Sequence, residues 1–166
     1  PWTFGGGGTL RNGTLTTSAV FTSTAAYTFD NLTVAAGTIV QLVGGGNYTI
    51  NVRNGLVIQG ELRIGSGTIT GNLSFANTQT VSGSGSIVFA NNTNNTLTSS
   101  SAGFTITLGP LLKLRGDKGT FGGQTAYILQ GILQPDVATG SISANSFVTS
   151  FTNAGRIEPI NGASVT

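Results

Sequence analysis

The sequence of 166 residues contains no cysteine, no histidine and no methionine. Without cysteine the chain has no disulfide framework and no thiolate chemistry. Without histidine it cannot form a Ser-His-Asp or Cys-His triad, nor the usual zinc and non-haem iron ligand sets. These absences exclude the commonest hydrolase mechanisms. We therefore expect a protein that is not an enzyme, with no catalytic residue, no cofactor and no metal site.

Charged residues are also scarce. They make up 7% of the chain, against roughly 25% in a typical soluble domain. The net charge of +2 rests on seven Lys and Arg against five Asp and Glu. That is too few for the clustered basic footprint of a nucleic-acid partner, and we expect none. A surface wetted by hydroxyls and amides is common in secreted and surface-exposed β proteins, so we expect an extracellular or cell-surface location.

Long apolar runs are missing as well. No stretch approaches the roughly 20 apolar residues of a membrane-spanning helix, so the sequence predicts no membrane insertion. The chain opens on Pro1 without an initiator methionine or a signal peptide. This start indicates a processed product or a piece of a longer protein.

Glycine is abundant, with 26 residues, and it recurs in one phrase: glycine, a variable residue, then an aliphatic residue. The copies begin at Gly8, Gly13, Gly37, Gly60, Gly67, Gly71, Gly85, Gly131, Gly140 and Gly155. Apolar residues alternate with Thr, Ser or Asn along most of the chain, which predicts short strands with one buried and one wet face. Related phrases return about every 20 to 25 residues, the range expected for coils of a β-solenoid.

We therefore predict one all-β domain over residues 1–166, a parallel β-helix (β-solenoid) of about seven to eight rungs. Glycines would stand where the coil turns sharply and φ > 0 is needed. The alternative is an antiparallel β-sandwich or jelly roll that polymerises by strand donation. Two polar stretches break the rhythm and are predicted as loops, 91–103 and 115–124.

Two phrases have a resemblance to a known class: FDNLTVAAGT at 29–38 and LVIQGEL at 56–62. They resemble coils of bacterial surface β-solenoids, namely filamentous-haemagglutinin-like adhesins and autotransporter passenger domains, and are similar in kind to phage tail-spike β-helices. The likeness is one of pattern and covers roughly residues 8–160. It implies a right-handed parallel β-helix used as a stalk, fibre or adhesive rod, and it carries over no catalytic residue.

Five carboxylates are candidates for acid–base chemistry: Asp30, Glu61, Asp117, Asp136 and Glu158. A glycoside hydrolase generally requires two that face one bond, about 5 to 10 Å apart. Here they are scattered singly along the sequence, although a coil could bring distant ones together. We favour solvated surface groups, with a carbohydrate-active solenoid as an alternative.

The tripeptide Arg115-Gly116-Asp117 matches the integrin-recognition motif and lies in the second predicted loop. It is the candidate adhesive loop. A charged surface loop in an otherwise uncharged protein explains the same residues equally well.

Other motifs concern the surface. Thr-x-Thr pairs, the ice-binding device of some β-solenoids, are unevenly spaced, so we interpret them as strand-forming and solubilising residues. Trp2, Tyr27, Tyr48 and Tyr127 are interpreted as core or capping residues in preference to sugar platforms. Six Asn-x-Ser/Thr sequons are candidate N-glycosylation sites. They begin at Asn12, Asn31, Asn47, Asn72, Asn91 and Asn94.

These observations favour an extracellular structural or adhesive module of a surface fibre, adhesin or filament. A solenoid has two open ends with unpaired backbone groups, and neither end of this sequence supplies a capping helix or a polar capping coil. We therefore expect the partner to be the protein itself, in an end-to-end or lateral homo-oligomer, or flanking repeats. Glycans or a host surface are further candidate partners.

Overall fold

The computed structural model describes residues 2–4, 7–23, 25–42 and 48–166, and these residues form β-strands and no helix. The strands are β1 (Trp2–Phe4), β2 (Gly8–Leu15), β3 (Phe21–Ser23), β4 (Tyr27–Val34), β5 (Ile39–Leu42), β6 (Tyr48–Ile58), β7 (Glu61–Ile64), β8 (Gly71–Phe75), β9 (Gln79–Ser82), β10 (Ser86–Phe89), β11 (Thr96–Ser99), β12 (Phe104–Leu108), β13 (Lys113–Gly116), β14 (Lys118–Phe121), β15 (Thr125–Leu129), β16 (Ile132–Pro135), β17 (Ser141–Ala144), β18 (Ser150–Asn153), β19 (Arg156–Ile157) and β20 (Ser164–Val165).

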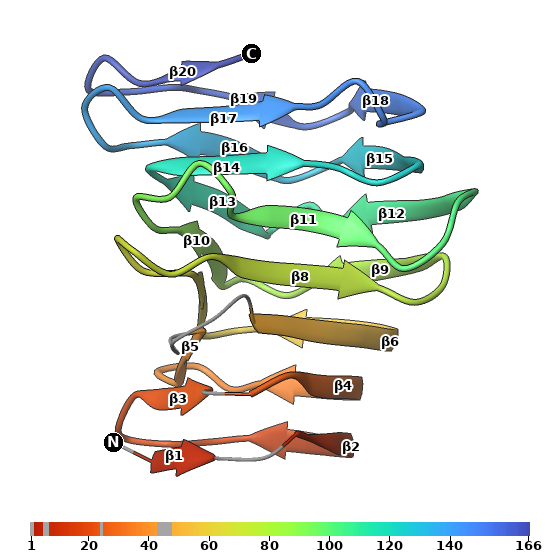
Figure 1. Ribbon diagram of the computed structural model, residues 1–166. Helices are drawn as coiled ribbons and strands as arrows, with labels where there is room; N and C mark the ends of the chain where they lie inside the picture. Colours follow the sequence, from red (N-terminus) through yellow and green to blue (C-terminus); the bar gives the residue numbers. More distant parts are fainter. Residues whose placement is uncertain (1, 5–6, 24, 43–47) are drawn as a thin grey trace.

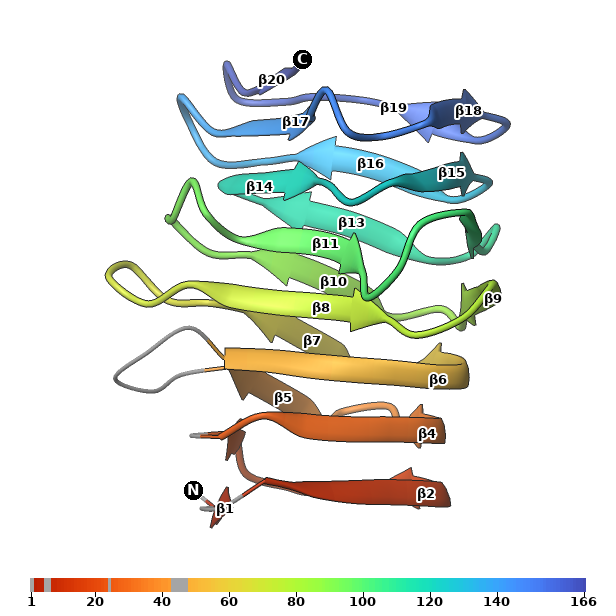
Figure 2. The same cartoon turned by 45° about the vertical axis from the view of Figure 1, so that its right-hand side comes forward.

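The strands stack as coils along one axis, from the N-terminal coil at the bottom of Figures 1 and 2 to the C-terminal coil at the top. Eight of them form sheet A, in the order β1-β3-β5-β7-β10-β13-β16-β19. The other twelve form a second sheet with two arms. The first arm continues from β6 through β8, β11, β14, β17 and β20, and the second through β9, β12, β15 and β18. Strands β2, β4 and β6 stack below the point where the arms separate, because β6 pairs with both β8 and β9. The complete coils above β6 therefore contribute strands to three faces.

All pairings between the named strands are parallel. Within the described residues, the antiparallel contact is an isolated bridge between Ser66 and Ile69. The predicted β-solenoid is confirmed, with about seven turns. The alternative of an antiparallel sandwich or jelly roll is wrong, because neighbouring strands run in the same direction.

The register in sheet A gives the length of each coil. Consecutive partners from the first coil to the last are Trp2, Phe21, Val40, Leu62, Ile87, Leu114, Leu133 and Ile157. The intervals between these positions run from 19 to 27 residues, close to the predicted spacing. The variation lies in the corners, because the strands themselves keep their register.

The core follows from the alternation in the sequence. Along the strands of sheet A, partly exposed residues alternate with buried ones. The buried residues of successive strands stack, so that Leu62, Ile87 and Leu114 lie fully buried one above another. Inward residues of the other two faces complete a single apolar cluster along the whole rod. Each buried aliphatic side chain contributes about 1.5–3 kcal/mol relative to leaving it in water.

The recurring glycine phrase has a steric cause in this stack. Gly60, Gly85, Gly131 and Gly155 each stand directly before a strand of sheet A. A Cβ on Gly85 would lie 2.1 Å from the carbonyl oxygen of Gly60, and a Cβ on Gly155 would lie 2.1 Å from that of Gly131. These glycines allow coils to approach closely at the corner, whereas the predicted need for φ > 0 holds at Gly37, with φ of 77°.

The prediction that residues 91–103 and 115–124 form loops is wrong for their central residues, which form strands. Strand β11 runs through the stretch 91–103 with Leu97 fully buried, and strand β14 runs through 115–124 with Phe121 buried. Each strand has few large apolar side chains, because Thr, Ser and Gly fill the remaining positions. A period of two with so few apolar residues is hard to recognise in the sequence.

None of the described residues forms a helix with the length and apolarity that crossing a bilayer requires.

Candidate functional site: the charged face of sheet A

The outer face of sheet A gathers most of the charge of the protein. Residues at its outward positions form two rows that run along the axis, one residue per coil. The first row is Ile39, Glu61, Ser86, Lys113, Ile132 and Arg156, and the second is Gln41, Arg63, Val88, Arg115 and Gln134. Together with Asp136 and Glu158, which follow strands β16 and β19, these rows hold seven of the twelve charged residues.

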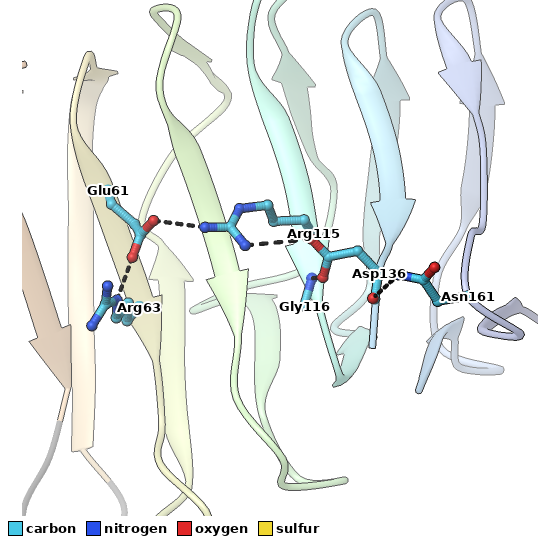
Figure 3. Close-up of polar contacts among 6 residues, drawn as sticks. All are labelled: Glu61, Arg63, Arg115, Gly116, Asp136 and Asn161. Atoms are coloured by element: carbon cyan, nitrogen blue, oxygen red, sulfur yellow. Dashed lines mark hydrogen bonds and ion pairs between the residues drawn. The ribbon is translucent and has the colours of Figure 1, made fainter. Parts of the chain in front are cut away.

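Glu61 and Arg115 join strands that are not neighbours. Nη2 of Arg115 on β13 lies 2.8 Å from Oε2 of Glu61 on β7, and the other carboxylate oxygen of Glu61 accepts a hydrogen bond from Nε of Arg63 (Figure 3). Strand β10 lies between them and presents the short, uncharged side chains of Ser86 and Val88 on this face. Arg115 can therefore extend across one whole coil.

Asp136 extends the network toward the C-terminal coils. Its Oδ2 lies 3.4 Å from Nη1 of Arg115, and its Oδ1 accepts a hydrogen bond of 3.0 Å from the backbone N–H of Gly116. The side-chain amide of Asn161 donates to the backbone carbonyl of Asp136 at 2.8 Å (Figure 3). Contacts of this half-exposed kind are worth about 0–1 kcal/mol each in water. Their main effect is to fix Arg115 and both carboxylates in one place.

A shallow groove of about 410 Å³ runs beside this network, along the corner where the second arm turns into sheet A. Its floor is formed by the glycines that precede the strands, which leave no side chain at the corner. The lining residues are Gly37, Thr38, Ile39, Gln59, Gly60, Glu61, Ser84, Gly85, Ser86 and Lys113. The groove thus presents hydroxyls, one amide, one carboxylate and one ammonium group over four successive coils.

Lys113 differs from the arginines of this face. Arg63, Arg115 and Arg156 each pair with a carboxylate, whereas no ion pair within 4.0 Å involves Lys113 among the described residues. Glu61 lines the same groove, but both of its oxygens are already engaged by arginine. Among the described residues, the groove therefore contains an ammonium group without an ion pair and a carboxylate that arginines neutralise.

A second polar cluster lies on the twelve-stranded sheet, where Arg11, Asp30 and Asn54 meet. Asp30 is 6% exposed and accepts hydrogen bonds from Asn54 at 2.7 Å and from Arg11 at 2.8 Å. The hydrogen bond from Asn54 lowers the pKa of Asp30, and Arg11 lowers it further against the opposing effect of burial. Asn12, Asn31 and Asn54 have φ of 51°, 52° and 56° and stack at the bend of their strands, so their local role is to turn the chain.

The predicted adhesive tripeptide does not form an exposed loop. Arg115 and Gly116 belong to strand β13, and Gly116 adopts φ of 112° at its end. Asp117 is only 8% exposed. The expectation of an exposed loop is therefore wrong, since hydrogen bonding between coils continues through these residues; integrin recognition itself stays a prediction without structural support.

The candidate glycosylation sites fall into three groups. The asparagine side chains of four described sequons are exposed: Asn12, Asn31, Asn91 and Asn94. Asn72 is half-buried on β8 and accepts a hydrogen bond from the hydroxyl of Thr96. Asn47 lies outside the described residues. Glycosylation of any of them remains a prediction.

Two of the tyrosines belong to the core, as expected. Tyr27 is 3% exposed and Tyr127 is fully buried. The hydroxyl of Tyr127 lies 2.9 Å from the carbonyl oxygen of Leu97 and 3.0 Å from that of Gly122. These two rings are therefore not available as sugar platforms.

Of the five carboxylates, the fold brings Glu61 and Asp136 together through their shared partner Arg115. Asp30 and Asp117 lie on other parts of the coil, and Glu158 pairs with its neighbour Arg156. Sequence reasoning missed the network and the groove. The intervals of 25 and 27 residues that place Glu61, Ser86 and Lys113 in one row were the available signal.

No group of three or more His, Cys, Asp or Glu side chains that could hold a metal ion occurs in the described ranges. Comparison of the chain with protein-family models, with curated proteins and with solved structures gave no match.

Proposed function

We propose that this chain is a non-enzymatic, extracellular structural or adhesive module, a β-solenoid segment of a surface fibre, adhesin or filament. Its work is mechanical: it supplies length, stiffness and resistance to proteolysis. The observation that carries the proposal is the unbroken parallel stack of coils over one apolar core. Backbone groups within such a stack are paired with the coil below and the coil above, and pulling along the axis must break many hydrogen bonds together.

The distribution of polar groups supports a structural role. Inward positions are mostly apolar along the rod, and the outward positions carry many Thr, Ser and Asn residues and the ion pairs of sheet A. The groove lined by Glu61 and Lys113 is shallow and lies on the outside of the rod. A binding role would therefore use the lateral faces of the rod.

The C-terminal end of the stack supports self-association or contact with flanking repeats. An apolar cavity of about 180 Å³ lies there between the last coils, lined by Phe121, Leu133, Ile142, Phe151, Ile157 and Val165 among others. Ile157 is 38% exposed and Ile160 is 41% exposed. A further coil of the same kind would cover this surface and pair with strands β18, β19 and β20. Head-to-tail contacts of this type extend into filaments when the rotation does not close.

Electron microscopy and sedimentation of the purified chain test the proposal. We expect rods or filaments at high concentration, with a repeat of about 4.8 Å along the axis. Ile157→Glu should abolish the association, because it places a carboxylate on the apolar end. The matched control is Leu111→Glu, since Leu111 is 73% exposed at a lateral corner between β12 and β13 and should leave association unchanged. A chain that stays monomeric at every concentration would contradict self-association, and equal effects of both variants would contradict the end-to-end geometry.

A further inference from the structure

We propose that the groove beside Lys113 is a binding site for an extended acidic glycan, a chain of sugars that carries carboxylate or sulfate groups. The glycan lies along the axis of the rod, across the coils that contribute Gln59, Ser84 and Ser86. Its anionic group sits over Lys113. This proposal rests on the adhesive half of the proposed function and names the class of ligand that the lateral face takes.

The charge of the groove favours an anion at one defined place. Arg63, Lys113 and Arg115 stand against Glu61 and Asp136, so this part of the face has one positive charge in excess. Since Glu61 holds Arg63 on one oxygen and Arg115 on the other, the excess is located at Lys113. An ammonium group without a carboxylate partner forms a stronger hydrogen bond with an anionic ligand than with a neutral one.

The backbone of the groove rules out recognition of a peptide by strand addition. The N–H groups of Glu61, Ser86 and Lys113 already donate to the carbonyls of Thr38, Gly60 and Gly85 in the coil below. Strand addition requires unpaired backbone groups, and helix binding requires an apolar groove for anchor side chains. These backbone N–H groups are paired, and Ile39 is the one large apolar side chain among the lining residues, which is too few for the several anchors of a helix.

The remaining polar groups match sugar hydroxyls. The hydroxyls of Ser84 and Ser86 and the amide of Gln59 can each donate and accept hydrogen bonds. No hydrogen bond within the protein is recorded for these three side chains in the described part of the chain. They come from two successive coils, about 4.8 Å apart along the axis. A single uncommitted lysine is too little charge for a nucleic acid, whose binding depends on several phosphate contacts.

The test is binding of the full chain to an array of acidic oligosaccharides with uronic, sialic or sulfated residues, each beside its neutral counterpart. A trisaccharide of galacturonic acid and its methyl ester then serve as probes for titration calorimetry if that acidic class is retained. We expect retention of acidic members and weaker retention of the neutral counterparts. Lys113→Gln should weaken the binding at least about tenfold, the loss of one charge-assisted hydrogen bond.

Lys118→Gln is the matched control. Lys118 is also half-buried and also lacks an ion pair in the described part of the chain, but it lies at the start of β14 on the first arm. It should leave glycan binding unchanged. Retention of no acidic glycan, equal binding of neutral counterparts, or an equal loss in both variants would each overturn the proposal. Filament formation is measured on the same variants. Lys113 is on the outer face, two coils before β19, so lost glycan binding with filaments intact concerns the groove alone.

Discussion

Removal of one buried hydroxyl, in the variant Tyr127→Phe, tests how the coils are held together inside the core. Tyr127 on β15 is fully buried, and its hydroxyl is within hydrogen-bond distance of the carbonyl oxygens of Leu97 and Gly122. The carbonyl of Leu97 also accepts the backbone N–H of Gly122 at 2.8 Å, so it keeps a partner in the variant. The carbonyl of Gly122 has no such replacement in the described contacts. We expect Tyr127→Phe to lose about 1–2 kcal/mol of unfolding free energy at pH 7.

The difference in unfolding free energy between the native protein and Tyr127→Phe should vanish in alkali. Burial raises the pKa of Tyr127 above its ordinary value of about 10. Below pH 10 the phenol is neutral in both the folded and the unfolded chain and adds no pH dependence. Above pH 10 the unfolded chain releases the proton while the folded chain keeps it, so the stability of the native protein falls as pH rises. At pH 11 this lowers the unfolding free energy of the native protein by about 1.4 kcal/mol. The Tyr127→Phe variant has no phenol at this position and does not lose this amount.

Urea unfolding of both proteins at pH 7 and pH 11 measures the two values, and other titrating groups cancel in the difference. Phe121→Leu is the control. The ring centroids of Phe121 and Tyr127 lie 5.1 Å apart in an edge-on contact, and Phe121 cannot ionise. Its deficit should be the same at both pH values. If the deficit of Tyr127→Phe is also unchanged at pH 11, or if the variant is as stable as the native protein at pH 7, the reasoning about the buried phenol is refuted.

Two further substitutions address the corners of the coil. Gly85→Ala should cost about 3 kcal/mol because its Cβ would meet the carbonyl oxygen of Gly60 at 2.1 Å; Gly67→Ala, with no atom within 4 Å of the new Cβ, should stay within about 0.5 kcal/mol of the native protein. Thermal unfolding of both variants measures this difference in stability. Equal stability of Gly85→Ala and Gly67→Ala would contradict the argument that the coils approach closely at Gly85. Asp30→Asn should be less stable than the native protein near neutral pH, where the carboxylate accepts the hydrogen bond from Asn54. Since the folded-state pKa of Asp30 is lowered, its contribution is present above about pH 4 and is lost as pH falls through the folded value. The stability deficit of Asp30→Asn relative to the native protein, measured by chemical unfolding, should therefore shrink in acid. A deficit that does not change with pH would contradict this role of the Asp30 carboxylate.

Much of the fold could be predicted from individual phrases. Gly60-Glu61-Leu62 and Gly85-Ser86-Ile87 begin strands of sheet A as the alternation indicated. The phrase at Gly67 is an exception, because Gly67 lies in the turn closed by the bridge between Ser66 and Ile69. Strand β11 was missed because its single buried apolar residue stands among hydroxyl residues.

The candidate site could not be predicted in the same way. Glu61 and Arg115 are 54 residues apart, and Arg115 and Asp136 are 21 apart. Coils of this protein differ in length, so a spacing in the sequence does not by itself give the coil position of a residue. The polar stretch 115–124 interrupts the apolar alternation and so predicted an exposed loop, but Arg115 lies in a strand and spans a coil to reach its partner.

The order of apolar and polar residues by itself determined that the chain forms short strands and buries one face of each, because a period of two suits no helix. Recurrent glycine phrases favoured a repeated coil over an antiparallel sandwich, but only the strand pairings in the structure decided that neighbouring strands run parallel. The identity of neighbours along the axis was decided only by the tertiary structure. Corners of different length absorb the irregular spacing while backbone hydrogen bonds keep the strands in register. That register, and no local signal, places Lys113, which forms no ion pair among the described residues, in the same row as a carboxylate that two arginines already neutralise.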